Sequence, residues 1–200
     1  IVVLLILTGT LISFKSYTGI LVLGSLFIVA VARVFSRKDF SYFWIVLFSL
    51  VISAWLFLSN FETSSALVIF APFWFIHSMV DSPDRVGWVR LSLARTGSET
   101  LGQWPKFIFA EVTSLVIFII GNLGLRFLSF GLLFKVKEVF KEDTLLFIFV
   151  ISIMSVGIPI LFIQSGNPWN TIQFFYYSLY ISALFAGVVI SYLVFKLNKV

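Results

Sequence analysis

The sequence lacks cysteine altogether, contains a single histidine, His77, and has few charged residues. Without cysteine the chain forms no disulfide and offers no thiolate nucleophile. One histidine argues against a zinc site built from His and Cys ligands. Lys, Arg, Asp and Glu together make up 12% of the 200 residues, which is about half the share in an ordinary soluble domain. The composition therefore argues against a soluble fold.

Apolar residues dominate the rest of the chain, with 60% hydrophobic residues and a mean hydropathy of +1.08. Hydrocarbon is the solvent in which so much apolar surface is tolerated. The net charge is +5, but the basic residues lie between apolar runs, where they act as topology signals and form no nucleic-acid patch. We therefore predict an all-α, polytopic transmembrane helical bundle whose partner is the lipid bilayer, with no nucleic-acid partner.

Eight apolar segments are candidates to cross the membrane, for which a helix needs about 20 residues. They are residues 1–14, 17–34, 41–59, 66–80, 105–120, 125–140, 144–163 and 171–197. The fourth segment contains Pro72. The sixth is apolar over only part of its length, so it is either a span extended by snorkelling lysines or a re-entrant half-helix. Gly121–Gly124 predicts a tight turn between the fifth and sixth segments.

The longest polar stretch, residues 81–105, separates the fourth and fifth segments. Ser82 and Pro83 are a typical cap and first residue of a helix, and residues 84–95 mix apolar side chains with arginines. This pattern predicts a short interfacial helix in a single transmembrane domain over residues 1–200. The apolar run begins at residue 1 without a Met or a basic leader, so we expect the chain to be part of a longer protein.

The positions of the lysines and arginines predict how the segments are oriented. If all eight segments cross, twelve of the 14 basic residues gather on one side, and only Lys15 and Arg126 lie on the other. If residues 106–140 formed one span, the basic residues would divide evenly. The positive-inside rule favours eight crossings, with the stretch 81–105 at the inner face and the connection 164–170 at the outer face.

The outer connection before the last segment carries most of the candidate binding residues. A helix N-terminus offers unpaired N–H groups and partial positive charge, which suits a phosphate. The hypothesis is a site for a lipid-phosphate head group or a sugar; the alternative is a helix cap at Asn170 or Thr171 beside an aromatic belt at the level of the lipid head groups. The candidate residues are Gln164, Asn167, Asn170, Thr171 and Gln173, with Arg126 as either a second anion contact or a snorkelling anchor.

Three acidic residues and the single histidine are further candidates. Glu111 is the one acid well inside an apolar run, which makes it a functional candidate, although it is also placed to reach the interface or to pair with a neighbouring helix. His77 and Asp81 are four residues apart and can pair on one helix face. Asp81 and Asp84 are weak candidates for oxygen ligands of a divalent metal, and they equally suit a helix cap.

Two stretches carry a resemblance to a known family: residues 77–85, His-Ser-Met-Val-Asp-Ser-Pro-Asp-Arg, and residues 166–177, Gly-Asn-Pro-Trp-Asn-Thr-Ile-Gln-Phe-Phe-Tyr-Tyr. With the many spans, they resemble large bacterial membrane proteins that look similar to the C-type, polyprenol-phosphate-sugar-dependent membrane glycosyltransferases. The resemblance implies an extracytoplasmic site where a sugar leaves a lipid carrier. That family carries a catalytic acid in an early outward loop, and here the outward acids reduce to Glu62. No catalytic residue is therefore assigned.

The leading hypothesis is part of a glycosyltransferase-like enzyme in the bacterial cytoplasmic membrane, acting on a polyprenyl-phosphate-linked sugar. A secondary transporter or flippase subunit is the alternative, with Glu111 as coupling acid and with Pro72, Pro159 and Gly121–Gly124 marking discontinuous helices. A non-catalytic membrane scaffold is the third. The sequence identifies no cofactor beyond the weak divalent-metal candidates.

Overall fold

The chain folds almost entirely into helices. The computed structural model describes residues 2–59, 68–135 and 139–197, with the backbone alone for residues 130–135 and 196–197. The elements are α1 (Val2–Phe14), α2 (Ser16–Arg37), α3 (Ser41–Ser59), β1 (Val68–Phe70), α4 (Trp74–Asp81), α5 (Val89–Thr100), α6 (Trp104–Leu123), the 3₁₀ helix η1 (Gly124–Lys135), α8 (Asp143–Leu161), β2 (Phe162–Gln164), the 3₁₀ helix η2 (Pro168–Ile172) and α9 (Gln173–Leu197).

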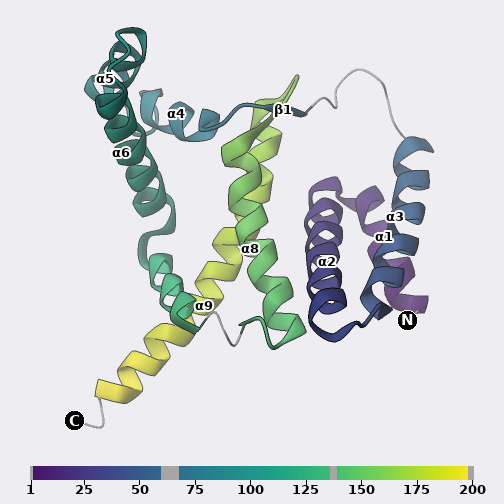
Figure 1. Ribbon diagram of the computed structural model, residues 1–200. Helices are drawn as coiled ribbons and strands as arrows, with labels where there is room; N and C mark the ends of the chain where they lie inside the picture. Colours follow the sequence, from purple (N-terminus) through teal and green to yellow (C-terminus); the bar gives the residue numbers. More distant parts are fainter. Residues whose placement is uncertain (1, 60–67, 136–138, 198–200) are drawn as a thin grey trace.

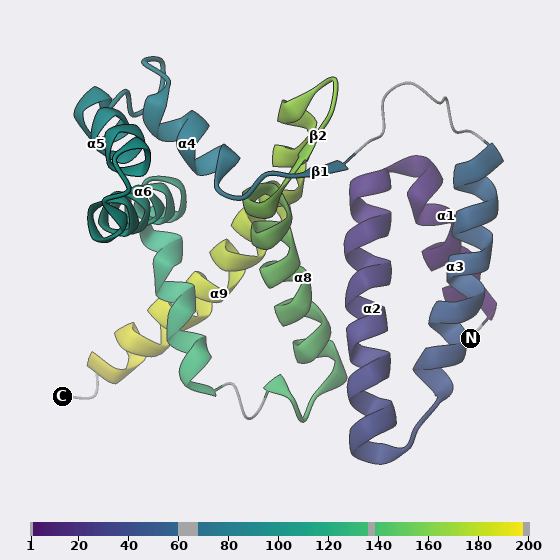
Figure 2. The same cartoon turned by 45° about the horizontal axis from the view of Figure 1, so that its top comes forward.

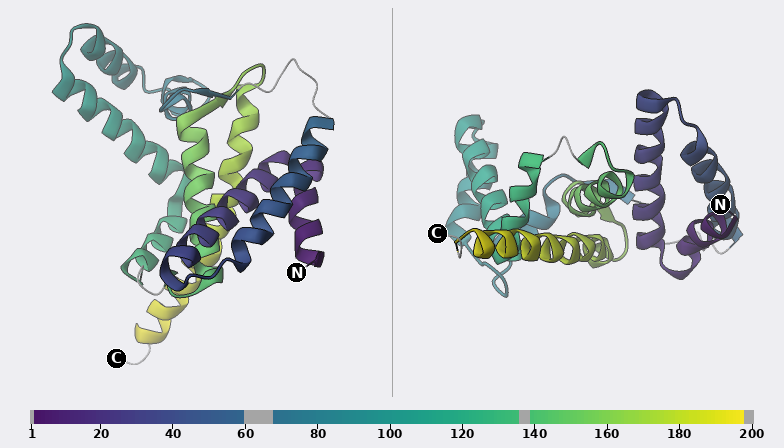
Figure 3. Two further views of the ribbon diagram at one scale, coloured as in Figure 1. Left: turned by 45° about the vertical axis from the view of Figure 1, so that its right-hand side comes forward. Right: turned by 90° about the horizontal axis from the view of Figure 1, so that it is seen from below.

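Three groups of helices lie side by side. Helices α1, α2 and α3 form one group, α8 and α9 form the middle, and α6 with η1 lies beyond them (Figures 1 and 3). Helices α4 and α5 lie at one end of this array. We call the end that carries residues 68–104 and 162–172 the α4–α5 end, and the end that carries residues 38–40 and 140–142 the Arg33 end.

Within the described residues, five helical stretches are long and apolar enough to cross a membrane, and α1 is a shorter apolar helix. The five are Ser16–Arg37, Ser41–Ser59, Trp104–Ser129, Asp143–Leu161 and Pro168–Phe195. The chain is thus a multi-pass, all-α integral membrane protein, as predicted. The prediction of eight crossings is not confirmed, and the differences lie in the fourth, fifth and sixth segments.

The predicted fourth span is not a membrane helix in its described part. Residues 68–70 form β1, which pairs antiparallel with β2 so that Ile69 lies opposite Ile163. Pro72 interrupts the apolar run, because proline lacks an N–H for a helical hydrogen bond. Phe73 then has φ +64°, and only the eight residues of α4 follow. Both pieces lie at the α4–α5 end (Figure 2).

The predicted fifth segment and the described start of the sixth, up to residue 135, form one continuous path. The side chain of Asn122 donates to the carbonyl of Phe118 at 2.8 Å, and Gly124, with φ +50°, ends α6. The chain then continues into η1, which packs against α9 and leads further from the α4–α5 end (Figure 1). The glycines bend the chain but do not reverse it. Pro159 likewise lies inside α8 and does not interrupt it.

The stretch 81–105 contains a helix, but not where the sequence predicted it. Ser82 and Pro83 form a turn, closed by a bond from Arg85 N–H to the Ser82 carbonyl at 3.0 Å. Gly87 has φ +59°, a backbone conformation that glycine adopts without strain. The helix therefore begins after this glycine, at Val89, and not at residue 84. The stretch also lies at the same end as β2 and η2, and not at the opposite face.

Close helix packing uses small residues and hydroxyl groups. Gly9 lies so near α3 that a Cβ atom at this position would be 2.9 Å from Ile52 Cβ. Ser53 donates to the carbonyl of Gly9 at 2.8 Å, and the hydroxyls of Thr8 and Ser49 are 2.6 Å apart. Small and hydroxylated residues let membrane helices approach closely where no hydrophobic force drives them together.

The Arg33 end is held by one buried cation. Arg33, whose side chain is 4% exposed, forms an ion pair with Asp143 at the start of α8 and donates to the carbonyl of Lys141 at 3.1 Å. Arg37 donates to the same carbonyl at 3.0 Å, and Tyr42 donates to Asp143 at 2.9 Å. Helices α2, α3 and α8 are thereby fixed to one another.

A short turn connects α2 to α3 at this end. Lys38 adopts a left-handed conformation with φ +54°, which ends α2. The carboxylate of Asp39 accepts the backbone N–H of Ser41 at 2.9 Å, and this hydrogen bond lowers the pKa of Asp39. The charged form of the aspartate therefore stabilises the start of α3.

Replacing Arg33 by Ala should strongly lower the thermal stability of the protein in detergent. Breaking a buried pair costs about 3–5 kcal/mol, and the partial exposure of Asp143, 28%, reduces that effect. Arg37→Ala is the matched control, because it removes the same charge from the exposed position. Equal melting temperatures for the two variants would contradict the role of Arg33.

Single cysteines test the arrangement of the ends, since the natural chain has none. Val86→Cys and Asn167→Cys, both at exposed positions, should react with a membrane-impermeant maleimide from the same side of a sealed vesicle. Lys141→Cys should react only from the other side. Labelling of Val86→Cys and Lys141→Cys from the same side would contradict this arrangement and support eight crossings.

Candidate functional site

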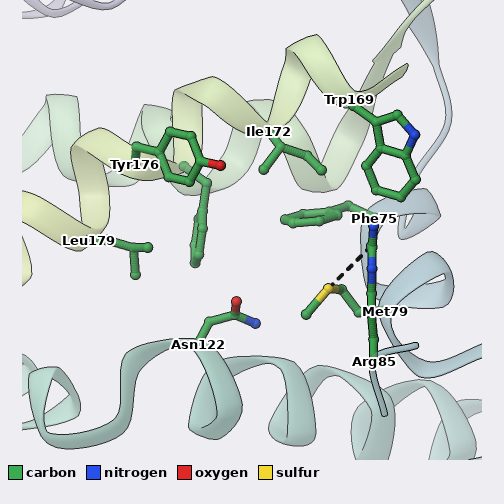
Figure 4. Close-up of a pocket in the computed structure, with 9 residues that line it drawn as sticks. Phe75, Met79, Arg85, Asn122, Trp169, Ile172, Tyr176 and Leu179 are labelled. Atoms are coloured by element: carbon green, nitrogen blue, oxygen red, sulfur yellow. Dashed lines mark hydrogen bonds between the residues drawn. The ribbon is translucent and has the colours of Figure 1, made fainter. Parts of the chain in front are cut away.

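A cavity of about 330 Å³ lies between α6 and α9 and ends against α4. Its walls are largely apolar and aromatic, and its polar groups come from Arg85, Asn122 and Tyr176 (Figure 4). The lining residues are Phe75, Met79, Arg85, Asn122, Trp169, Ile172, Phe175, Tyr176 and Leu179. An apolar pocket with a few convergent polar groups is the usual form of a ligand site.

Helical periodicity places the cavity-lining residues of η2 and α9 on one face. Residues three apart share a face of a 3₁₀ helix, so η2 presents Trp169 and Ile172 together. The change to an α-helix in α9 continues the same stripe through Tyr176 and Leu179. Beneath the cavity, Phe75, Phe118 and Phe175 pack with ring centroids 5.2–6.1 Å apart, which joins α4, α6 and α9.

Arg85 is the cation of the cavity. Its guanidinium carbon lies 4.1 Å from the centroid of the Trp169 ring, in a cation–π contact. Its other contacts are weak: Nη1 is 3.4 Å from the Met79 sulfur, and Nε is 3.9 Å from the largely exposed Asp84 carboxylate. Stacking on an aromatic ring holds a guanidinium in place and leaves its edge donors available.

A second polar group lies on the other side of α4. We call His77, Asp81, Arg95 and Glu111 the charged quartet. His77 Nε2 is 2.9 and 3.0 Å from the two Glu111 oxygens, and Arg95 Nη2 is 2.7 Å from Asp81. Arg95 Nε is 3.8 Å from Glu111, so the four groups form one chain across α4, α5 and α6.

The interior of the quartet is buried, and its edge is open. The side chains of Arg95 and Glu111 are 7% and 13% exposed, against 30% for His77 and 36% for Asp81. Arg95 Nη1 and Asp81 Oδ1 are buried without a hydrogen-bond partner among the described residues. Because unpaired buried polar atoms are costly, the arrangement is not optimised for stability alone.

The predicted site residues of the outer connection lie next to the cavity but do not line it. Gln164 is in β2, and its N–H donates to Thr171 Oγ1 at 3.0 Å, so the buried Thr171 braces the connection and does not cap α9. Asn170 N–H donates to the carbonyl of Asn167, the residue that precedes η2. Asn167 is exposed, and Gln173 is half-buried at the first turn of α9.

Arg126 does not join these residues. It is exposed in η1, which runs away from the α4–α5 end, while η2 lies at that end (Figure 1). Its neighbour in the predicted turn, Asn122, does line the cavity. The prediction that the Gly121–Gly124 turn and residues 164–170 share a face was wrong, because α6 and η1 follow one path.

The acidic candidates take partners on other helices. Glu111 pairs with His77, and Asp81 pairs with Arg95, so His77 and Asp81 do not pair with each other. Asp84 is 78% exposed beside Arg85. The described residues bring no third His, Cys, Asp or Glu to Asp81 and Asp84 as a metal-ligand group.

The residues that sequence analysis missed are Arg85 and Arg95. Both lie in the stretch assigned to the face opposite residues 164–170, where Arg85 could not meet Trp169. Trp169 and Tyr176 belong to a segment that the sequence singled out, but their aromatic rings suggested an interfacial belt. No protein-family model, curated protein or solved structure matches this chain.

Replacing Thr171 by Val should destabilise the wall of the cavity. The change removes a buried hydroxyl that accepts a backbone hydrogen bond, an effect of about 1–3 kcal/mol. Thermal unfolding in detergent measures it, and Thr171→Ser, which keeps the hydroxyl, is the control. If both variants melt like the natural protein, the hydroxyl does not brace the connection.

Proposed function

We propose that this integral membrane protein binds a polyprenyl-phosphate-linked sugar in the cavity between α6 and α9, as part of a glycosyltransferase-like enzyme. The observation that carries the proposal is the stack of Arg85 on Trp169 in an otherwise apolar cavity. The two residues come from the two stretches that carry the family resemblance. The proposal moves the binding role from Gln164–Gln173 and Arg126 to the cavity beside them.

Arg85 suits the phosphate of such a ligand. A guanidinium binds phosphate oxygens through two parallel N–H groups, and these bonds are strong because both partners are charged. The sulfur of Met79 and the distant carboxylate of Asp84 are weak competitors. A phosphate would therefore satisfy donors of Arg85 that the protein leaves underused.

The remaining walls suit the sugar and the hydrocarbon chain. Asn122 and the hydroxyl of Tyr176 provide polar groups for sugar hydroxyls, while Ile172, Phe175 and Leu179 form an apolar stripe. That stripe follows α9 from its start at the α4–α5 end into the span Pro168–Phe195. A ligand with a charged head and a hydrocarbon tail matches this gradient along one helix.

The charge distribution favours a cavity on the extracytoplasmic side. The described backbone places Arg33, Arg37, Lys38, Lys135, Lys141 and Lys196 toward the Arg33 end. The α4–α5 end carries five basic residues, Lys15, Arg85, Arg90, Arg95 and Lys106, one fewer than the Arg33 end. Under the positive-inside rule, this excess of one basic residue supports an Arg33 end that faces the cytosol. The proposed location is the bacterial cytoplasmic membrane.

A flippase or secondary transporter is the second candidate, and the pairing of Glu111 with His77 favours it. Acids and histidines paired within membrane proteins often belong to proton relays. A fluorescent polyprenyl phosphate in proteoliposomes distinguishes the classes. Movement of this lipid between leaflets would support a flippase, and binding without movement would support the enzyme.

Arg85→Ala should weaken binding of decaprenyl phosphate about tenfold to a hundredfold, because a hydrogen bond to a charged group contributes about 1.5–3 kcal/mol. Native mass spectrometry of the protein in detergent measures the bound fraction. Arg90→Ala is the matched control, since Arg90 is exposed in the same stretch. Decaprenol and inorganic phosphate, tested alone, separate the contributions of tail and head group.

Equal binding by the Arg85 and Arg90 variants would exclude the cavity as the phosphate site. Equal binding of decaprenol and decaprenyl phosphate by the natural protein would show that the head group is not recognised.

A further inference from the structure

We infer that the charged quartet is a proton-binding site, in which His77 gains and loses the proton, and that its charge is coupled to the cavity across α4. The inference rests on the proposed function, because it takes an anionic lipid as the ligand of the cavity. It adds that the binding of this ligand depends on the protonation of the quartet. The quartet itself does not line the cavity.

The quartet becomes electrically neutral when it holds one additional proton. Two carboxylates, Asp81 and Glu111, face one guanidinium, Arg95. Histidine is the side chain that ordinarily changes charge near neutral pH. With a neutral His77 the quartet carries one net negative charge, and with a protonated His77 it carries none. An uncompensated charge is costly where two of the four groups are almost buried.

The groups around His77 come from all three packed helices. Asp81 follows one turn later on α4, Arg95 reaches in from α5, and Glu111 holds Nε2 from α6. Phe73 lies beside the ring, with centroids 6.1 Å apart. The 30% exposure of His77 gives a proton a route from the water at the α4–α5 end.

Helix α4 connects the quartet to the cavity. His77 and Asp81 lie on one of its faces, while Phe75 and Met79 line the cavity from another. A helix is about 10 Å wide, and a unit charge at that distance contributes about 1.7 kcal/mol at an effective dielectric constant of about 20. Loss of the proton from His77 should therefore repel an anion in the cavity and weaken its binding about tenfold to twentyfold.

The probe should keep one charge at all pH values used. Farnesyl phosphoryl glucose is a phosphodiester, so its single negative charge does not change between pH 5.5 and pH 8.0. The natural protein should bind it about tenfold more weakly at pH 8.0 than at pH 5.5. In His77→Gln the two affinities should agree within about twofold, and His77→Asn serves if that variant does not fold. Glu99→Gln, on the exposed face of α5, should behave like the natural protein.

Equal affinity of the natural protein at both pH values would overturn the coupling, as would an unchanged pH dependence in the His77 variants. If the natural protein does not bind the diester at all, the proposed function fails and the proton site is tested on its own.

His77 is the single histidine, so ¹⁵N-histidine NMR reports on it alone. The signal of a ring N–H bonded to a carboxylate should be present in the natural protein and in Glu99→Gln, and absent in Glu111→Gln. Identical ring signals in all three proteins would exclude the quartet as a joint proton site.

Discussion

Every backbone N–H and C=O group inside hydrocarbon needs a partner from the chain itself, and this constraint governs the whole fold. Helices meet it without help, which is why they fill most of the described residues. Where the chain leaves the helical form, at residues 68–73 and 162–164, the two extended pieces bond to each other and to the end of α8. This pairing fixes the stretch 68–104 beside η2. Two residues that line the cavity, Arg85 and Trp169, lie in the connections that follow these extended pieces.

The all-α class and the presence of several long apolar helices follow from the sequence, because apolar runs of about 20 residues have few other solutions. The topology does not follow, since it depends on whether a marginal segment crosses. Pro72 turns one predicted span into a surface element, and Gly124 joins two predicted spans into one path. Each of these two differences removes one predicted crossing. Helices α8 and α9 therefore still run in the predicted directions. The prediction puts the stretch 81–105 at the end opposite residues 164–170 and reverses the chain at residues 121–124. In the structure the stretch 81–105 lies at the same end as η2, and the chain continues through residues 121–124.

The dependence of the topology on marginal segments also explains which residues of the candidate site the sequence could predict. The sequence analysis predicted binding residues within 164–173, but hydrogen bonds within the connection use Thr171 and Asn167 for local structure. The cavity uses their neighbours Trp169 and Ile172, because a 3₁₀ turn exposes positions three apart. The role of Arg85 could not be predicted from the sequence, because its contact with Trp169 requires the stretch 81–105 and residues 164–170 to lie at the same end. Glu111 was recognisable by its position, yet its partners His77 and Arg95 come from other helices.

Helix α4 shows how eight residues can separate two different environments. Its apolar positions Phe75 and Met79 face the cavity, and its polar positions His77 and Asp81 face α5 and α6. If His77 paired with Asp81 on the same helix, Glu111 would lose its hydrogen bonds to His77 and keep only Arg95, 3.8 Å away. Pairing each with a group on another helix gives every buried charge an opposite neighbour, and it fastens α4 where it closes the cavity. A quartet that served stability alone would be replaceable by apolar side chains at little cost, so the presence of four ionisable groups in so apolar a chain points to a use for their charge.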